Sequence, residues 1–216
     1  MKKDPTEKNR ILIVDDHPLF RQGLQQMIDD RPELIVCGQA ADAAEALRVI
    51  PELKPDLVLV DISLGGTSGI DLVKSIRDQH EDLPVLVISM HDESLYAERA
   101  LRAGAMGYVM KHEPAATVEA AISTVLGGHI YVSPRMSTSM LAKFTRGKSD
   151  EPSSALQKLT DRELEVFRML GQGKGTRQIA EELNLTIATI NTFRAHIKEK
   201  LQLKSSTEVM LHAIQE

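Results

Sequence analysis

The first 130 residues alternate short apolar runs with segments of helical period, and this alternation constrains the fold more than any other feature of the chain. The apolar runs are strand-length, rich in β-branched residues and mostly continuous; they occupy residues 11–14, 34–37, 57–60, 85–88 and 106–109. Continuous apolar runs are typical of strands that are covered on both faces, as in a parallel sheet.

Segments of helical period follow each run, at residues 18–29, 43–50, 69–79, 94–102 and 115–126. Pro18, Pro51 and Pro114 lie at predicted helix edges, where proline is tolerated. Because alternating strands and helices build right-handed crossovers, we predict an α/β domain over residues 9–128. Its core is a doubly wound, five-stranded parallel sheet.

The pattern changes after residue 128. Residues 145–155 are small and polar, and we assign residues 129–155 to a linker with a short helix at about 134–144. Only helical patterns follow, at residues 161–171, 175–183, 187–200 and 206–214. The short turns between them favour a compact, all-α four-helix domain over residues 156–216.

Composition excludes several functions. Aromatic residues make up 3% of the chain and Trp is absent, which argues against stacking on single-stranded nucleic acid. No apolar run is long enough to cross a bilayer, and no signal-type apolar stretch follows the charged N-terminus. The single cysteine, Cys37, fits a reducing compartment. We therefore expect a cytoplasmic protein that has no membrane partner.

Polar side chains follow the predicted strands at one edge of the sheet: Asp15, Asp16, Asp61, Ser89 and Lys111. Ligands of open parallel sheets bind at this edge. A single Asp at such a position is often no more than a turn former or a helix cap. Several converging carboxylates, however, repel one another unless a cation lies between them, and an oxygen-only ligand set suits Mg²⁺.

The chemistry that fits this set is phosphoryl transfer to a carboxylate. Asp61 would attack phosphorus and form an aspartyl phosphate, while Mg²⁺ on Asp16 and Asp61 would neutralise charge. Lys111 would pair with the phosphoryl oxygens, and Ser89 would donate a hydrogen bond to one of them.

Residues 11–18 (Ile-Leu-Ile-Val-Asp-Asp-His-Pro), 57–64, 87–93 and 107–111 resemble the receiver domain of two-component response regulators. The resemblance implies a flavodoxin-like fold and phosphorylation of Asp61 by a sensor histidine kinase. It also implies a Mg²⁺ pocket of Asp15, Asp16, Asp61 and the backbone carbonyl of Ser63, and a conformational switch pair of Ser89 and Tyr108. We interpret His17 as a loop residue rather than a ligand.

One loop departs from the family pattern. Gly65 stands where the family usually has proline, and glycine makes a loop more mobile. We hypothesise that this substitution alters metal ordering and the lifetime of the phosphoryl group.

Residues 175–183 and 187–200 have the pattern of a helix-turn-helix, with Thr186 as N-cap of the second helix. Ile190, Phe193, Ile197 and Leu201 form the predicted buried stripe of that helix. Residues 187–204 contain four basic residues and one acidic residue. This charge is consistent with a DNA-binding helix and also with a helix that is simply exposed to solvent.

Residues 159–166, Ile179-Ala180 and 189–201 resemble the LuxR-type DNA-binding domain. Nearly the whole chain, except the linker, is therefore similar to NarL/FixJ-type response regulators. The resemblance implies binding to double-stranded promoter DNA. We expect Asn191 and Thr192 to face base edges, and Arg194, Lys198 and Lys200 to meet mainly phosphates. The remaining candidate contacts are Thr189, Ala195 and Lys204. Asn191 and Gly175 replace a Lys and a Ser that are common in the family.

The expected mechanism is a phosphorylation switch in which Ser89 moves toward the phosphate, Tyr108 moves inward and the surface near residues 90–112 changes. The change either releases the helical domain or drives homodimerisation. Val209, Met210, Ala213 and Ile214 form either a dimer stripe or packing within the domain.

Three other functions are open at this point: a phosphorylation-independent DNA binder, a phosphatase that uses an aspartate nucleophile, and a protein-binding helical domain. The chain keeps all five polar residues at the edge of the sheet, which argues against a phosphorylation-independent DNA binder. A phosphatase would need a second Asp where Ser63 stands, so we expect no enzymatic turnover. DNA binding that is absent or insensitive to salt would favour the third function.

Overall fold

The computed structural model describes residues 8–64, 67–145 and 155–215. The chain divides into two compact units between Thr145 and Arg146. Gly65 and most of the polar segment 145–155 lie outside the described residues. No helix in the described part combines the length and the apolar character that a bilayer crossing needs.

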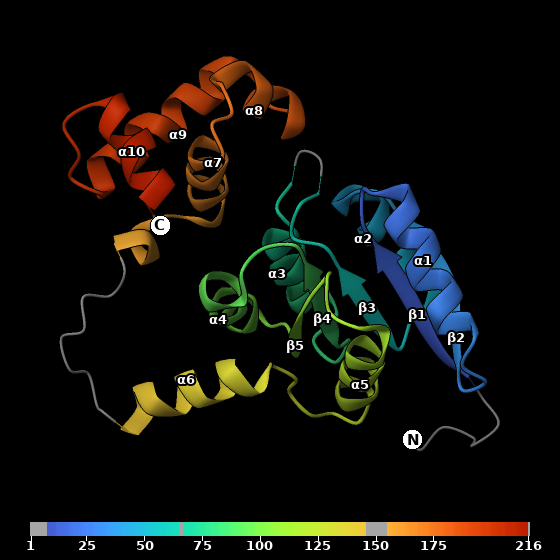
Figure 1. Ribbon diagram of the computed structural model, residues 1–216. Helices are drawn as coiled ribbons and strands as arrows, with labels where there is room; N and C mark the ends of the chain where they lie inside the picture. The colour runs from blue at the N-terminus through green and yellow to red at the C-terminus, as the bar shows by residue number, and fades with distance from the viewer. Residues whose placement is uncertain (1–7, 65–66, 146–154, 216) are drawn as a thin grey trace. The chain divides into compact units, whose positions relative to one another are not determined.

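The first unit is built on a parallel sheet with strand order β2-β1-β3-β4-β5 (Figure 1). The strands are β1 (Asn9–Val14), β2 (Leu34–Ala40), β3 (Leu57–Val60), β4 (Val85–Ser89) and β5 (Gly107–Met110). The helices are α1 (Pro18–Asp29), α2 (Ala43–Leu53), α3 (Gly69–Gln79), α4 (Glu93–Ala103), α5 (Ala115–Leu126) and α6 (Pro134–Thr145). The predicted doubly wound sheet is confirmed, and strand order reverses between β1 and β3.

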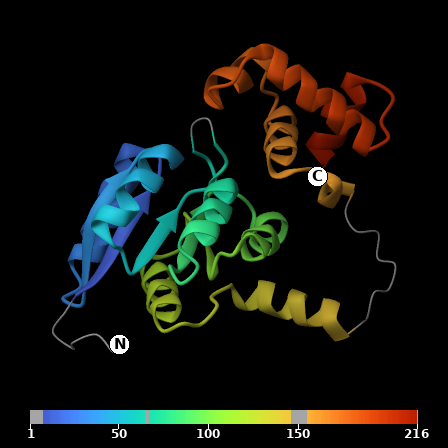
Figure 2. The same cartoon turned by 180° about the vertical axis from the view of Figure 1, so that it is seen from behind.

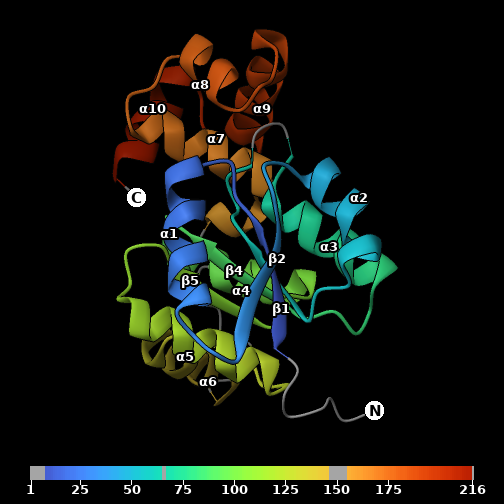
Figure 3. The same ribbon diagram turned by 90° about the vertical axis from the view of Figure 1, so that its right-hand side faces the viewer.

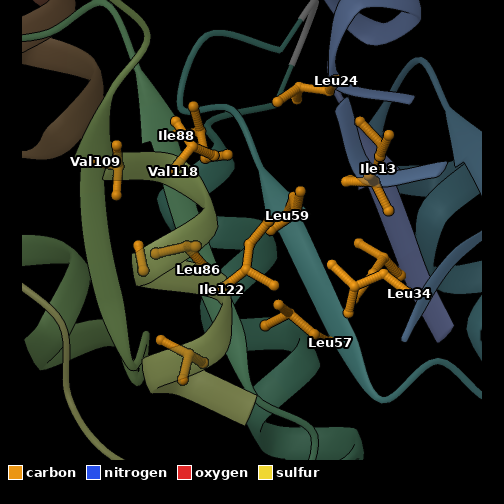
Figure 4. Close-up of a cluster of buried hydrophobic side chains, with 14 residues drawn as sticks. Ile13, Leu24, Leu34, Leu57, Leu59, Leu86, Ile88, Val109, Val118 and Ile122 are labelled. Carbon is orange, nitrogen blue, oxygen red and sulfur yellow. The ribbon is translucent and has the colours of Figure 1, made fainter. Parts of the chain in front are cut away.

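Helices cover the sheet on both sides, as the continuous apolar runs predict (Figure 3). One face carries α1 and α5, whose apolar residues pack on alternate residues of the strands; Figure 4 shows this cluster, which includes Ile13, Leu24, Leu59, Ile88 and Ile122. The opposite side of the sheet carries α2, α3 and α4 (Figure 2). The central strand β3 is therefore buried along its whole length.

One detail differs from the sequence prediction. Pro51 does not lie at a helix edge but inside the last turn of α2, which continues to Leu53. The helix ends at Lys54, which is in the left-handed conformation and donates its N–H to Ile50 O. Cys37 is only half-buried because β2 is an edge strand.

The chain returns to the sheet after α5. Tyr131 forms an isolated parallel bridge with Gly107. Tyr131 N–H donates to Met106 O at 2.9 Å, and Tyr108 N–H donates to Tyr131 O at 3.0 Å. The segment that leads into α6 is therefore attached to the open edge of β5.

The second unit contains a 3₁₀ turn (Ala155–Lys158) and four α-helices, α7 (Asp161–Gly171), α8 (Thr176–Glu182), α9 (Ile187–Lys200) and α10 (Ser206–Gln215). Thr160 and Glu163 form a capping box at the start of α7. Helices α7 and α10 pack closely at Gly171, where a Cβ would overlap the carbonyl oxygen of Ala213. The predicted all-helical domain is confirmed.

Candidate functional site

Three charged side chains from separate strands meet at the carboxyl edge of the sheet. Asp15 follows β1, Asp61 follows β3 and Lys111 follows β5. Lys111 Nζ bridges Asp15 Oδ2 at 2.6 Å and Asp61 Oδ2 at 2.7 Å, and all three side chains are at most 4% exposed. The ring of Phe20 lies 4.5 Å from the same ammonium group and supports it by a cation–π contact.

Burial gives Asp61 unusual electrostatics. It raises the pKa of the Asp61 carboxyl to about 6, with the nearby Asp15 charge acting in the same direction. The Lys111 ammonium and a backbone hydrogen bond from Ser63 oppose the rise. Asp61 Oδ1 is buried, and no group among the described residues meets the geometry of a hydrogen bond to it. Burying a carboxylate oxygen without a hydrogen-bond partner costs folding free energy. Such unpaired buried groups are typical of functional sites.

The acidic pocket fits a divalent cation. Ligand atoms of Asp15, Asp16, His17 and Asp61 all lie within 4.8 Å of one another. Carboxylate oxygens are the ligands that hard divalent ions prefer, and the unpartnered Asp61 Oδ1 offers one of them. The structure also brings the His17 imidazole to this pocket, with Nδ1 at 2.7 Å from Asp16 Oδ1. The sequence analysis interpreted His17 only as a loop residue.

The structure brings the predicted switch residues together around His91, which sequence reasoning missed. The Tyr108 ring is 1% exposed, and its hydroxyl donates to the backbone oxygen of His91 at 2.6 Å. Ser89 is fully buried, and its Oγ accepts from His91 N–H at 3.2 Å. The His91 ring stacks on Tyr96 and hydrogen-bonds Ser63 Oγ at 2.8 Å. Nothing in the sequence distinguishes His91 except its position two residues after Ser89.

Gly69 is a second residue that sequence reasoning missed. It is the first residue of α3 and packs against the backbone that carries Asp61. A Cβ at this position would overlap the carbonyl oxygen of Asp61. Glycine is therefore required where α3 approaches the Asp61 loop.

The helix-turn-helix consists of α8 and α9, and Thr186 caps α9 by accepting from Thr189 N–H, as predicted. The buried stripe is narrower than expected because Ile190 and Ile197 are buried, whereas Phe193 and Leu201 are only half-buried.

The predicted DNA-contact residues differ in their surroundings. Asn191, Thr192, Ala195 and Lys204 are exposed, and Thr189, Arg194, Lys198 and Lys200 are half-buried. Arg194 donates to Thr176 Oγ1 at 2.6 Å. Lys200 Nζ lies 2.6 Å from Oε2 of the buried Glu163. Lys200 therefore has a structural partner within the domain, which the sequence pattern does not reveal.

The fold and the site define a receiver domain joined to a helix-turn-helix DNA-binding domain, and comparison with known proteins agrees. Residues 11–123 match the response regulator receiver domain family, and residues 157–213 match the family of bacterial regulatory proteins described as luxR. The chain belongs to the two-component response regulators of NarL/FixJ type, which are non-enzymatic transcription regulators with a LuxR-type DNA-binding domain.

Individual relatives agree along most of the chain. The oxygen regulatory protein NreC of Staphylococcus carnosus is 32% identical over 95% of this chain and 96% of its own length. A LuxR-family response regulator from Aurantimonas has a crystal structure with a TM-score of 0.60 and 37% identity, covering 64% of this chain and 99% of that one. The response regulator ChrA of a heme-sensing system has a TM-score of 0.53 and 28% identity over 96% of this chain and 97% of that one.

Proposed function

We propose that this chain is cytoplasmic and controls transcription through phosphorylation of Asp61 by a sensor histidine kinase. The observation that carries the proposal is the state of the Asp61 carboxylate. One oxygen is bound to Lys111, and the other is buried, without a hydrogen-bond partner in the described residues, at the edge of the sheet where ligands bind. A nucleophile needs such an available oxygen, held by a neighbouring cation that remains in place during transfer.

In the transfer, an Asp61 oxygen attacks the phosphorus of a phosphohistidine, so that an O–P bond forms as the N–P bond breaks. Lys111 stays beside the oxygens of the transferred group, and the Ser89 hydroxyl donates a hydrogen bond to one of them. Asp15, Asp16, Asp61 and the Ser63 carbonyl would hold Mg²⁺, which supplies charge neutralisation when bound.

Phosphorylation would stabilise the inward position of Tyr108. Ser89 lies at the end of β4, and the Tyr108 hydroxyl bonds to the backbone two residues further along the chain. A hydrogen bond from Ser89 to the phosphoryl group would therefore restrain the segment that holds the Tyr108 hydroxyl. The ring has its inward position in this structure, so the switch would act on the population of that conformation.

The output would be promoter binding by a homodimer. Asn191 and Thr192 lie on the exposed face of α9 and would contact base edges, with Thr189 and Ala195 beside them. Arg194, Lys198 and Lys204 would bind phosphates, with a smaller contribution from Lys200 because it is paired with Glu163.

The test is intact mass and light scattering of the full chain after incubation with acetyl phosphate, with and without Mg²⁺, for wild type and Asp61→Asn. We expect a Mg²⁺-dependent gain of one phosphoryl group and dimer formation, both lost in the variant. A phosphoryl gain that survives in Asp61→Asn would contradict the assignment of the nucleophile. If promoter binding is equally tight in both proteins, with or without acetyl phosphate, the receiver does not control the output.

A further inference from the structure

His17 is placed at the acidic pocket by its own backbone and that of the next residue. It is the N-cap of α1 and precedes Pro18, and a residue before proline is restricted to extended conformations. Its φ of −94° and ψ of 102° agree with this restriction. The side chain makes no capping hydrogen bond to the helix, although the N-cap position would allow one. The imidazole is instead turned toward the carboxylates.

The position of His17 Nδ1 is that of a ligand atom. It lies 2.7 Å from Asp16 Oδ1, 3.2 Å from Asp15 Oδ1 and 3.9 Å from Asp61 Oδ2. Around a small divalent ion with ligands at about 2.1 Å, neighbouring ligand atoms are about 3 Å apart and opposite ones about 4.2 Å. These three distances match that spacing.

Lys111 contacts only one of these ligand atoms, Asp61 Oδ2. Its ammonium contacts the Oδ2 atoms of Asp15 and Asp61, whereas His17 lies nearest to the Oδ1 atoms of Asp15 and Asp16. The buried Asp61 Oδ1 has no hydrogen-bond partner in the part of the chain that the structure describes. The pocket therefore offers carboxylate oxygens and one imidazole nitrogen that the lysine does not occupy.

We propose that His17 is a nitrogen ligand of the metal pocket and that the pocket prefers first-row transition-metal dications to Mg²⁺. Mg²⁺ prefers oxygen ligands, whereas imidazole raises affinity for ions such as Mn²⁺, Co²⁺ and Zn²⁺. The inference rests on the proposed function, because that function makes this pocket the metal site of the receiver. The His17 side chain is 64% exposed, so solvent ions reach it directly.

The first test measures affinity. The full chain is titrated with Mg²⁺, Mn²⁺ and Co²⁺ by calorimetry for wild type, His17→Ala and the control His129→Ala, which removes an exposed histidine after α5. We expect His17→Ala to weaken Co²⁺ binding by about tenfold or more, to weaken Mn²⁺ binding less, and to change Mg²⁺ binding by less than about twofold. His129→Ala should bind all three ions as wild type does.

The second test detects the nitrogen directly and needs no activity. Pulsed electron paramagnetic resonance of the Mn²⁺-loaded wild type should show one coupled imidazole nitrogen, which disappears in His17→Ala and His17→Asn and persists in His129→Ala. Absence of the coupling in wild type, or its persistence without His17, overturns the inference. Mg²⁺-dependent phosphorylation of Asp61 without nitrogen coupling would overturn this inference alone. Failure of all three ions to bind would instead overturn the metal pocket of the proposed function.

Discussion

Asp61 carries its charge at a cost in folding free energy. The folded-state pKa of about 6 lies above the ordinary value of 3.8, so the folded protein binds this proton more tightly than the unfolded chain does. The stability that Asp61 contributes is fully present below pH 3.8 and is lost as the pH rises through about 6. At neutral pH the charged Asp61 carboxylate therefore destabilises the receiver.

Asp61→Asn should stabilise the receiver at pH 7 by about 1–3 kcal/mol, because it removes a buried charge. The gain should shrink toward pH 4, where the wild-type carboxyl is protonated in the folded state. Calorimetric unfolding of the full chain between pH 4 and 8 measures the difference. The exposed Asp82→Asn is the matched control and should show no such trend. A stability difference that does not depend on pH would contradict the assignment.

At the scale of elements, α9 combines its proposed DNA-facing role with a structural one. Lys200 lies in its last turn and pairs with Glu163 of α7, a carboxylate that is 2% exposed. Hydrogen bonds from Lys200 and Thr160 lower the pKa of Glu163 although its burial opposes them. Among the described residues, no carboxylate pairs with Lys198, only two positions earlier.

The two lysines should therefore respond differently to substitution by alanine. Lys198→Ala should weaken binding to all DNA sequences alike and reduce the salt slope by about one unit, with little effect on stability. Lys200→Ala should destabilise the helical unit by about 1–2 kcal/mol, because it leaves a buried carboxylate without its cation. Binding isotherms at several salt concentrations and thermal unfolding separate these effects.

The pH dependence gives the Lys200 prediction a control. Since the folded-state pKa of Glu163 is lowered, its contribution to stability is present above the ordinary value of 4.5 and is lost as the pH falls through the folded value. The stability difference between wild type and Lys200→Ala should accordingly decrease in acid. Equal stability of both lysine variants at pH 7 would show that the ion pair contributes nothing.

At the scale of the whole molecule, the proposed function requires the two units to communicate through assembly or release. The sequence left open whether the apolar residues of α10 form a dimer stripe or pack within the domain. Val209 is buried within its own domain, whereas Met210 and Ile214 are 40% and 58% exposed. The exposed pair is spaced four residues apart, so both side chains lie on one face of the helix. This face is the candidate surface for a DNA-bound dimer.

Ile214→Glu should weaken cooperative promoter binding by about tenfold or more and leave phosphorylation of Asp61 unchanged, because it places a charge in the dimer contact. Gel-shift titration of the phosphorylated full chain measures the first effect, and intact mass measures the second. Ile130→Glu changes an equally exposed apolar residue outside α10 and serves as the control. Unchanged cooperativity in Ile214→Glu would remove α10 from the proposed dimer surface.

Periodicity alone determined most of the architecture. Apolar runs of strand length and intervening helical segments predict the parallel sheet, because a chain with this pattern must cover both faces of its strands. Segments such as α3, α5, α7 and α9 begin and end at the predicted residues, since caps and turn residues are local signals. The resemblances to the receiver and LuxR-type domains were confirmed by the family matches. They could be recognised from the sequence because they too depend on local motifs.

Only the tertiary structure decided which side chains share an environment. The ion pair of Lys200 and Glu163 joins residues 37 positions apart, and the Tyr108–His91 bond joins residues 17 apart. The approach of Gly69 to Asp61 and the turn of His17 into the acidic pocket likewise depend on how elements pack. Sequence patterns report the period and the ends of elements, whereas partners, burial and pKa shifts arise from distances that exist only after the elements have packed together.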